Sequence, residues 1–139
     1  MSTRYRAKIS KKNKYWISKH RYYEIAHHCM QYKEWKDEYD VLDKQGVKGL
    51  DFDGMPHGTD VGNPTEAIGL RKVILKNKID TLEETLRECE PDMYKYLLVA
   101  VTNEGISYNY LRMVMGFKAN EKAYYRERRK FYWLMSQKI

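Results

Sequence analysis

Apolar and aromatic residues recur every three or four positions through the first part of the chain, which is the spacing of one face of an α-helix. This pattern predicts a single long helix over residues 15–44, which Gly46 and Gly49 end. Its aromatic members are expected to pack against the next two helices, and surplus aromatic surface would favour a homodimer. The stripe consists of Tyr22, Ile25, Cys29, Tyr32, Trp35, Tyr39 and Leu42.

A glycine-rich loop is expected next, because residues 45–63 hold five glycines, one proline and three aspartates. A second helix is predicted to begin after this loop, with Asn63 as its N-cap and Pro64 at the first helical position. Its apolar positions again follow one face of a helix. They are Ile68, Leu75, Ile79, Leu82, Leu86 and Cys89.

A third helix is predicted over residues 92–104, because Pro91 restarts the chain and Gly105 is placed to close the helix. Its inward side is expected to carry Met93, Tyr96, Leu97, Ala100 and Val101.

The last third of the chain predicts two helices joined by a tight turn. Ser107 suits the N-cap of a short helix over residues 108–115, and Gly116 supplies the left-handed residue that a tight turn needs. Phe117 is expected to plug the turn, and Asn120 to cap a long last helix. The residues expected to be buried are Leu111, Val114 and Met115 before the turn, and Tyr124, Phe131, Leu134 and Met135 after it. This order of elements is that of a helix-turn-helix.

Charge separates the two ends of the chain from its middle. Residues 1–22 carry eight Lys or Arg and no acidic residue, and residues 106–139 carry eight basic and two acidic residues. Residues 23–105 carry ten basic and seventeen acidic residues, although the whole chain has a net charge of +7. Two basic ends around an acidic middle favour a polyanionic partner, and the helix-turn-helix pattern points to double-stranded DNA.

The last helix carries a basic face that is predicted to contact DNA. Arginine can bridge guanine O6 and N7 or bind a phosphate, and the start of a recognition helix usually reads the bases. Asn120, Lys122 and Tyr125 are therefore assigned to base reading. The full set of expected DNA-binding residues is Lys118, Asn120, Lys122, Tyr125, Arg126, Arg129 and Lys130, the last three as phosphate ligands. A solvated basic helix is the alternative.

The predicted fold is all-α, with a long N-terminal helix, a glycine-rich loop and a helical bundle that ends in a C-terminal helix-turn-helix. Residues 1–14 are interpreted as a basic flexible arm, which either contacts DNA or stays a solubilising tail. Residues 15–62 hold the N-terminal helix and the loop. Residues 63–139 form the expected helical DNA-binding domain, with the helix-turn-helix at about 107–137.

The chain resembles the RinA-like family of phage late-transcription activators over roughly residues 22–139, and its end resembles the helix-turn-helix of the fourth region of sigma-70-type factors. The resemblance implies a phage activator of late operons that acts with host RNA polymerase in the bacterial cytoplasm. Arg112 stands where helix-turn-helix proteins commonly have a small residue, so either its side chain points outward or the two helices of the motif pack more openly. The segments that carry the resemblance are QYKEWKDEYDVL at 31–42, DGMPHGTDVGNPTEAIGLRK at 53–72, GISYNYLRMVMGF at 105–117 and YYRERRKFYWLM at 124–135.

Little in the sequence favours catalysis, a cofactor or a metal. Neighbouring residues on a helix point about 100° apart, so His27, His28 and Cys29 cannot share one metal ion. Cys29 and Cys89 are interpreted as reduced cytoplasmic thiols. No apolar run approaches the roughly 20 residues of a membrane span, and no secretory signal is expected.

Two other functions stay open. A phage DNA-packaging adaptor or inhibitor protein would use the helix-turn-helix to engage a host nucleoprotein. A magnesium-dependent nuclease would use the carboxylates of the glycine-rich loop, although loop carboxylates usually cap and turn the backbone instead. The loop residues concerned are Asp51, Asp53, His57 and Asp60.

Overall fold

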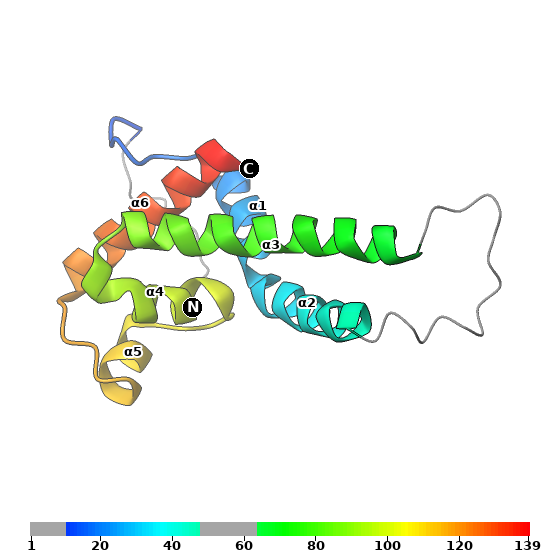
Figure 1. The fold of residues 1–139 in the computed structure, drawn as a ribbon. Helices are drawn as coiled ribbons and strands as arrows, with labels where there is room; N and C mark the ends of the chain where they lie inside the picture. Colours follow the sequence, from blue (N-terminus) through cyan, green and yellow to red (C-terminus); the bar gives the residue numbers. More distant parts are fainter. Residues whose placement is uncertain (1–10, 48–63) are drawn as a thin grey trace. The chain divides into compact units, whose positions relative to one another are not determined.

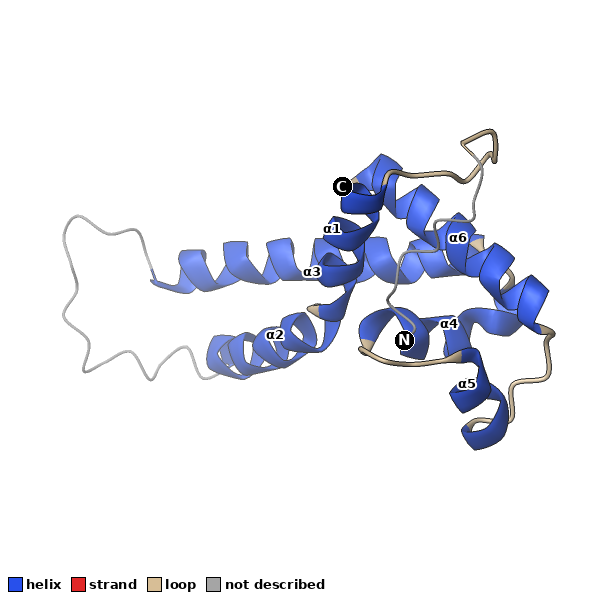
Figure 2. Ribbon diagram, turned by 180° about the vertical axis from the view of Figure 1, so that it is seen from behind, coloured by secondary structure: helices blue, strands red, loops and turns tan. Residues whose placement is uncertain are grey.

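A computed structural model describes residues 11–47 and 64–139, and every regular element in these two ranges is helical (Figures 1 and 2). This confirms the all-α class. No helix in the described ranges is long and apolar enough to cross a membrane. The elements are α1 (Lys19–Met30), α2 (Tyr32–Val47), α3 (Pro64–Glu88), the short 3-10 helix η2 (Pro91–Met93), α4 (Tyr94–Thr102), α5 (Tyr108–Val114) and α6 (Glu121–Lys138).

The described residues divide into two compact units. The first unit consists of residues 11–32 and 81–139, and the second of residues 33–47 and 64–80. This division differs from the predicted boundary at residue 63, because α1 packs against α4 and α6 in the first unit. A helix from the start of the chain therefore shares a core with the end of the chain.

The single helix predicted over residues 15–44 is wrong, because the chain forms α1 and α2 with a break at Gln31. Gln31 keeps helical torsion angles, and its N–H donates to His28 O at 3.2 Å, which tightens the last turn of α1. The division between the two units follows at Lys33. Neither a glycine nor a proline stands at this break. Helix α2 also continues through Gly46 to Val47.

The other helix predictions agree more closely with the structure. Helix α3 begins at Pro64, as expected, and the N-cap prediction for Asn63 lies outside the described residues. The third predicted helix is split into η2 and α4, and Gly105 follows it with a φ of +77°. The predicted core stripe of α3 is buried at Leu75, Ile79, Leu82, Leu86 and Cys89, and Ile68 is half-buried.

The core of the first unit combines apolar side chains with one buried cation. Arg128 on α6 is only 5% exposed, and its Nη2 donates to Tyr22 Oη on α1 at 2.8 Å. The ring of Tyr132 lies 4.9 Å from that of Tyr22 and 5.5 Å from the Arg128 guanidinium. Burial alone would lower the pKa of Arg128, but the surrounding tyrosine oxygens outweigh burial and raise it. Arg128 thus stays charged and joins α6 to α1.

The second unit is a pair of helices that run in opposite directions. Arg71 on α3 donates to both carboxylate oxygens of Glu38 on α2, at 2.7 and 3.0 Å, and this hydrogen bonding lowers the pKa of Glu38. The ammonium of Lys78 lies 5.7 Å from the ring centre of Trp35. Trp35 and Leu75 are buried in this unit. Figures 1 and 2 both show α2 alongside this part of α3.

The expected aromatic surplus is not at the surface, because Tyr22, Tyr32 and Trp35 are each less than 9% exposed. Tyr32 Oη donates to Glu83 Oε2 at 2.5 Å. The exposed apolar side chains lie elsewhere. The large ones are Val41, Leu70, Val73, Ile74, Tyr110, Met113, Val114 and Ile139.

Both cysteines are free and buried, as the sequence suggested. Burial raises the pKa of each thiol, and for Cys89 burial and the nearby Glu127 carboxylate together raise it to about 12. The thiolate is the reactive form, so both thiols are expected to react slowly with a disulfide reagent in the native protein near neutral pH. Both should react rapidly in denaturant. Fast native labelling of either thiol would contradict this burial.

The contact between Arg128 and Tyr22 is expected to stabilise the first unit. Tyr22→Phe and Arg128→Met should each lower the free energy of unfolding by about 1–3 kcal/mol, because each leaves a buried polar group without its partner. The double variant should lose about 0.5–3 kcal/mol less than the sum of the two single losses. Denaturant unfolding measures all four proteins. The exposed Lys122→Ala control should change stability by less than about 0.5 kcal/mol. Strict additivity would show that the two side chains are not coupled.

Candidate nucleic-acid interface

Helices α5 and α6 are joined by a tight turn that is built from local hydrogen bonds. Ser107 Oγ accepts from Tyr110 N at 3.0 Å, which caps α5 as the sequence predicts. Leu111 O accepts from both Met115 N at 3.2 Å and Phe117 N at 3.0 Å. The φ of Gly116 is +73°, so the chain reverses through a left-handed residue, as expected.

Aromatic side chains hold this turn against the rest of the first unit. Phe117 is 4% exposed, and its ring stacks on that of Tyr96 with the centres 4.5 Å apart. Tyr124 at the start of α6 meets the edge of Phe117 at 5.9 Å. Tyr108 Oη donates to Ala119 O at 2.6 Å, which ties the start of α5 to the chain just before α6. The predicted plug of the turn is therefore present, and it fixes where α6 begins.

The inward face of α6 sets the rotation of the helix about its own axis. Asn120 Oδ1 accepts from Ala123 N at 2.8 Å, so Asn120 is the N-cap that the sequence predicts. Glu127 Oε1 accepts from Glu90 N at 3.0 Å, and its neighbour Arg128 donates to Tyr22. The other buried residues on this face are Tyr124, Phe131, Tyr132 and Met135, while Leu134, which was expected inside, is half-buried.

The opposite face of α6 carries most of the predicted DNA-binding residues. A helix turns by about 100° per residue, so positions 122, 125, 126 and 129 share a face that points away from Phe131 and Met135. Lys122 and Arg126 are exposed, and Tyr125, Arg129 and Lys130 are half-buried. Lys118 is exposed in the turn, and Asn120 is exposed at the N-cap. The structure thus brings all seven residues onto the turn and one helix.

Besides Asn120, whose Oδ1 forms the cap, Arg126 and Tyr125 make contacts within the protein. The Arg126 Nε lies 3.2 Å from Glu127 Oε2, in a pair whose arginine is 58% exposed. The ring of Tyr125 meets that of Tyr124 at 4.8 Å and lies 5.8 Å from the Arg128 guanidinium. Lys122 and Arg126 are the exposed cations on the outward face, whereas Arg129 and Lys130 are half-buried.

The sequence did not reveal that Arg128 is buried, and two residues that it predicts to be buried at the end of α5 are not. Leu111 is fully buried as predicted, but Val114 is 65% exposed and Met115 only half-buried. Val114, Met113 and Tyr110 follow one another at helical spacing on the exposed side of α5, and that spacing could have revealed a second apolar face. Arg112 is exposed, which is one of the two arrangements that the sequence left open for it.

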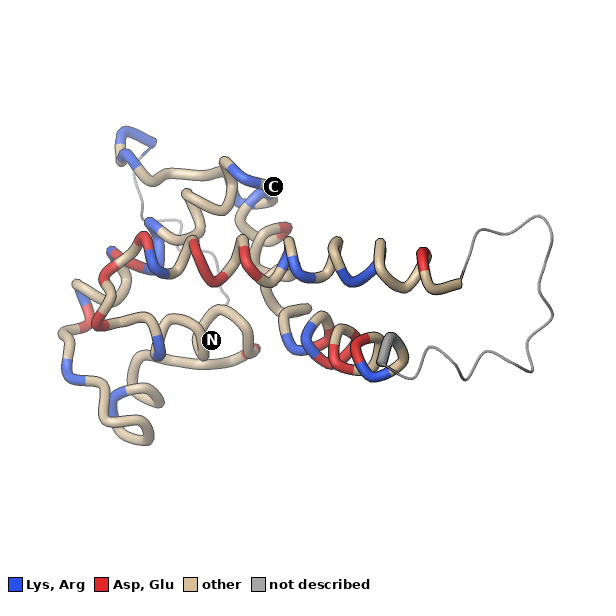
Figure 3. The backbone as a smooth tube through the Cα atoms, in the orientation of Figure 1, with Lys and Arg blue, Asp and Glu red and all other residues tan. Residues whose placement is uncertain are grey.

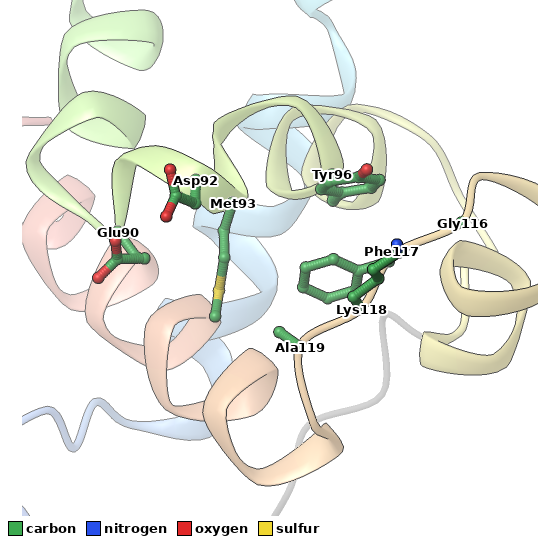
Figure 4. A pocket seen from close by; sticks show the side chains of 8 residues that line it. All are labelled: Glu90, Asp92, Met93, Tyr96, Gly116, Phe117, Lys118 and Ala119. Carbon is green, nitrogen blue, oxygen red and sulfur yellow. The ribbon is translucent and has the colours of Figure 1, made fainter.

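A hollow of about 480 Å³ lies between the start of α4 and the turn. Met93, the stacked rings of Tyr96 and Phe117, and the turn itself line it (Figure 4). Glu90 and Asp92 also line the hollow, with Lys118 across from them. Two carboxylates disfavour a phosphate in this hollow. The outward face of α6 is therefore the better site for a polyanion.

The charge pattern of the described residues agrees with this placement. Helix α6 carries six Lys or Arg and two Glu, whereas α2 carries three Lys and five Asp or Glu, and α3 carries five residues of each sign (Figure 3). Within the described ranges, no group of three or more His, Cys, Asp or Glu could hold a metal ion. The loop carboxylates Asp51, Asp53 and Asp60, together with His57, lie outside the described residues, as do residues 1–10 of the basic arm.

No protein-family model, curated protein or solved structure matches the chain. The proposed function therefore rests on the geometry of α5, the turn and α6.

Replacing Gly116 tests the turn. A Cβ at Gly116 would meet nothing within 4 Å, so the cost of Gly116→Ala comes from its positive φ alone, and we expect a loss of about 1–2 kcal/mol in the free energy of unfolding. Gly69→Ala is the matched control, because Gly69 is also unobstructed but lies within α3. There alanine should stabilise the protein by about 0.5–1 kcal/mol. Equal effects of both substitutions in urea unfolding would contradict the assigned turn.

Proposed function

We propose that the chain is a double-stranded DNA-binding transcription regulator that places the outward face of α6 in the major groove. The observation that carries the proposal is the division of α6 into two faces. One face is fixed to the core by Tyr124, Arg128 and Phe131, and the other presents Lys122 and Arg126 to solvent. A major groove is wide enough for one α-helix, and its donor and acceptor pattern distinguishes all four base pairs.

The capped start of α6 supports this arrangement. The first backbone N–H groups of a helix and its dipole attract phosphates, and the turn before α6 adds the exposed Lys118. Asn120 uses its Oδ1 for the cap, which leaves its amide N–H₂ to donate outward. The side chains nearest the helix start, Asn120, Lys122 and Tyr125, are proposed to read bases.

The later basic residues are proposed to bind phosphates. Arg126, Arg129 and Lys130 follow the same helix for about one more turn, and arginine and lysine are the usual phosphate ligands. Because Arg126 also pairs with Glu127, its guanidinium is held partly in place before DNA arrives. Arg128 is excluded from this set, since it is buried and bonded to Tyr22.

The resemblance to phage late-transcription activators extends the proposal to a biological setting. In that setting the protein binds upstream of a late operon in the bacterial cytoplasm and acts with host RNA polymerase. The extension rests on the sequence segments that carry the resemblance, whereas DNA binding by α6 rests on the described geometry. Footprinting with and without RNA polymerase tests the two parts separately. Protection by the protein alone tests DNA binding, and a change in protection when RNA polymerase is added tests whether the protein acts with the polymerase.

The salt dependence of DNA binding tests the assigned face. Each phosphate contact contributes about 0.9 to the slope of log K against log salt concentration. Because Arg126 is assigned to a phosphate and Lys122 to a base, Lys122→Ala combined with Arg126→Ala should reduce that slope by about 1 and weaken binding at low salt, as measured by fluorescence anisotropy with a labelled duplex.

A charge-matched control separates local contacts from net charge. Lys44→Ala combined with Lys95→Ala removes two exposed cations on α2 and α4 and should change the slope by much less. If the two double variants lost affinity equally, the outward face of α6 would have no special role. If neither lost affinity, the DNA-binding surface would lie elsewhere on the chain.

A further inference from the structure

A lysine-rich turn precedes α1 in the first unit. Residues 11–19 hold four lysines and no acidic residue. Asn13 Oδ1 accepts from Tyr15 N at 2.8 Å, and Asn13 O accepts from Trp16 N at 3.1 Å. An asparagine side chain that bonds to the backbone two residues ahead is a common way to fix a turn. Residues 11–16 therefore form a lysine turn, whose exposed cations are Lys11, Lys12 and Lys14.

The lysine turn packs against the outward face of α6. The ring of Tyr15 meets the ring of Trp133 edge-on, with the centres 5.6 Å apart. At about 100° per residue, Trp133 lies within about 20° of both Lys122 and Arg126 around the helix axis. Trp133 is half-buried, although its position faces away from the core. The lysine turn thus continues the basic face at the far end of α6, where the blue segment meets the red end of the helix (Figure 1).

Aromatic rings hold two of these lysines without neutralising them. Lys11 Nζ lies 5.8 Å from the ring centre of Trp16, and Lys14 Nζ lies 5.5 Å from that of Tyr15. A ring attracts a cation through its quadrupole but carries no net charge, so both ammonium groups stay charged. The same ammonium groups occupy the rings that a stacked base would need. The turn therefore suits phosphates better than bases.

We propose that the lysine turn is a second contact with the DNA backbone, in which its lysines bind phosphates beyond those bound by α6. The inference rests on the proposed function of α6. Trp133 lies four residues beyond Arg129, which is about 6 Å along the helix axis. The lysine turn is therefore about one helical turn beyond the residues already assigned to phosphates. Duplex DNA carries about one negative charge per 1.7 Å of its axis, so a basic face that continues in this direction meets further phosphates.

The contact between Tyr15 and Trp133 gives the lysine turn a fixed place before DNA arrives. Binding costs conformational freedom for every segment that becomes ordered. Because Asn13 and Tyr15 already order the turn in the free protein, less freedom is lost when the lysines bind. Tyr15 is thus a positioning residue, and the lysines are the ligands.

Removing the three lysines together tests the contact. The triple variant should reduce the slope of log K against log salt concentration by about 2–3, because each phosphate contact contributes about 0.9. Fluorescence anisotropy with a labelled duplex measures the slope. The substitutions are Lys11→Gln, Lys12→Gln and Lys14→Gln.

A charge-matched control removes three exposed lysines of α2, through Lys33→Gln, Lys36→Gln and Lys44→Gln. The control should change the slope by less than a single phosphate contact does. A wild-type slope for the lysine-turn variant, or an equal reduction in both variants, would overturn the proposal.

Tyr15→Ala tests whether the place of the turn matters, because it keeps every charge. It should weaken DNA binding about three- to tenfold, since the turn then becomes ordered only when DNA binds. Tyr15→Phe keeps the ring contact with Trp133 and should bind like the wild-type chain. Circular dichroism should show unchanged helix content for both variants, because Tyr15 precedes α1. Equal affinities of Tyr15→Ala and the wild-type chain would contradict the positioning role of Tyr15.

Lys122→Ala combined with Arg126→Ala, measured beside these variants, keeps the two proposals apart. If that variant loses affinity and the lysine-turn variant does not, the lysine turn has no role and the proposed function of α6 stands. If only the lysine-turn variant loses affinity, the contact at the turn stands and the assignment of the outward face of α6 is wrong. A wild-type chain that binds no duplex would refute both.

Discussion

The orientation of α6 depends on two polar contacts that adjacent residues make inside the first unit. Arg128 donates to Tyr22 on α1, and Glu127 accepts from the backbone of Glu90. An apolar face alone tolerates small rotations, because dispersion and the hydrophobic effect have little directionality. A buried guanidinium must keep its partner, since losing that partner leaves a desolvated charge. The exposure of Lys122 and Arg126 on the far side of α6 follows from this constraint.

The local features of the chain could be predicted from sequence because they depend on local chemistry. Ser107 and Asn120 cap helices through their own side chains, and Gly116 is the residue that a positive φ favours. The break at Gln31 could not be predicted, because Gln31 has no local signal for one. Arg128 was missed for a related reason. Whether an arginine points inward depends on which residue faces it, and Tyr22 lies 106 positions away in the sequence.

The seven candidate DNA-binding residues show the same limit. Helical spacing was enough to group Lys122, Tyr125, Arg126 and Arg129 on one face. It could not show that Tyr125 packs against Tyr124 or that Arg126 pairs with Glu127. The exposure of each side chain, which spacing does not give, singles out Lys122 and Arg126 as the most accessible cations of this face. On α3, likewise, the apolar spacing identified the core face, whereas the exposure of Leu70, Val73 and Ile74 is visible only in the folded chain.

Footprinting on fragments of the parent genome tests whether the outward face of α6 binds specific sequences of duplex DNA. We expect discrete protected segments that persist in excess nonspecific duplex and disappear when Lys122 and Arg126 are both replaced by alanine. Uniform weak protection of every fragment, or the same discrete segments with the double variant, would show that this face does not bind specific sequences.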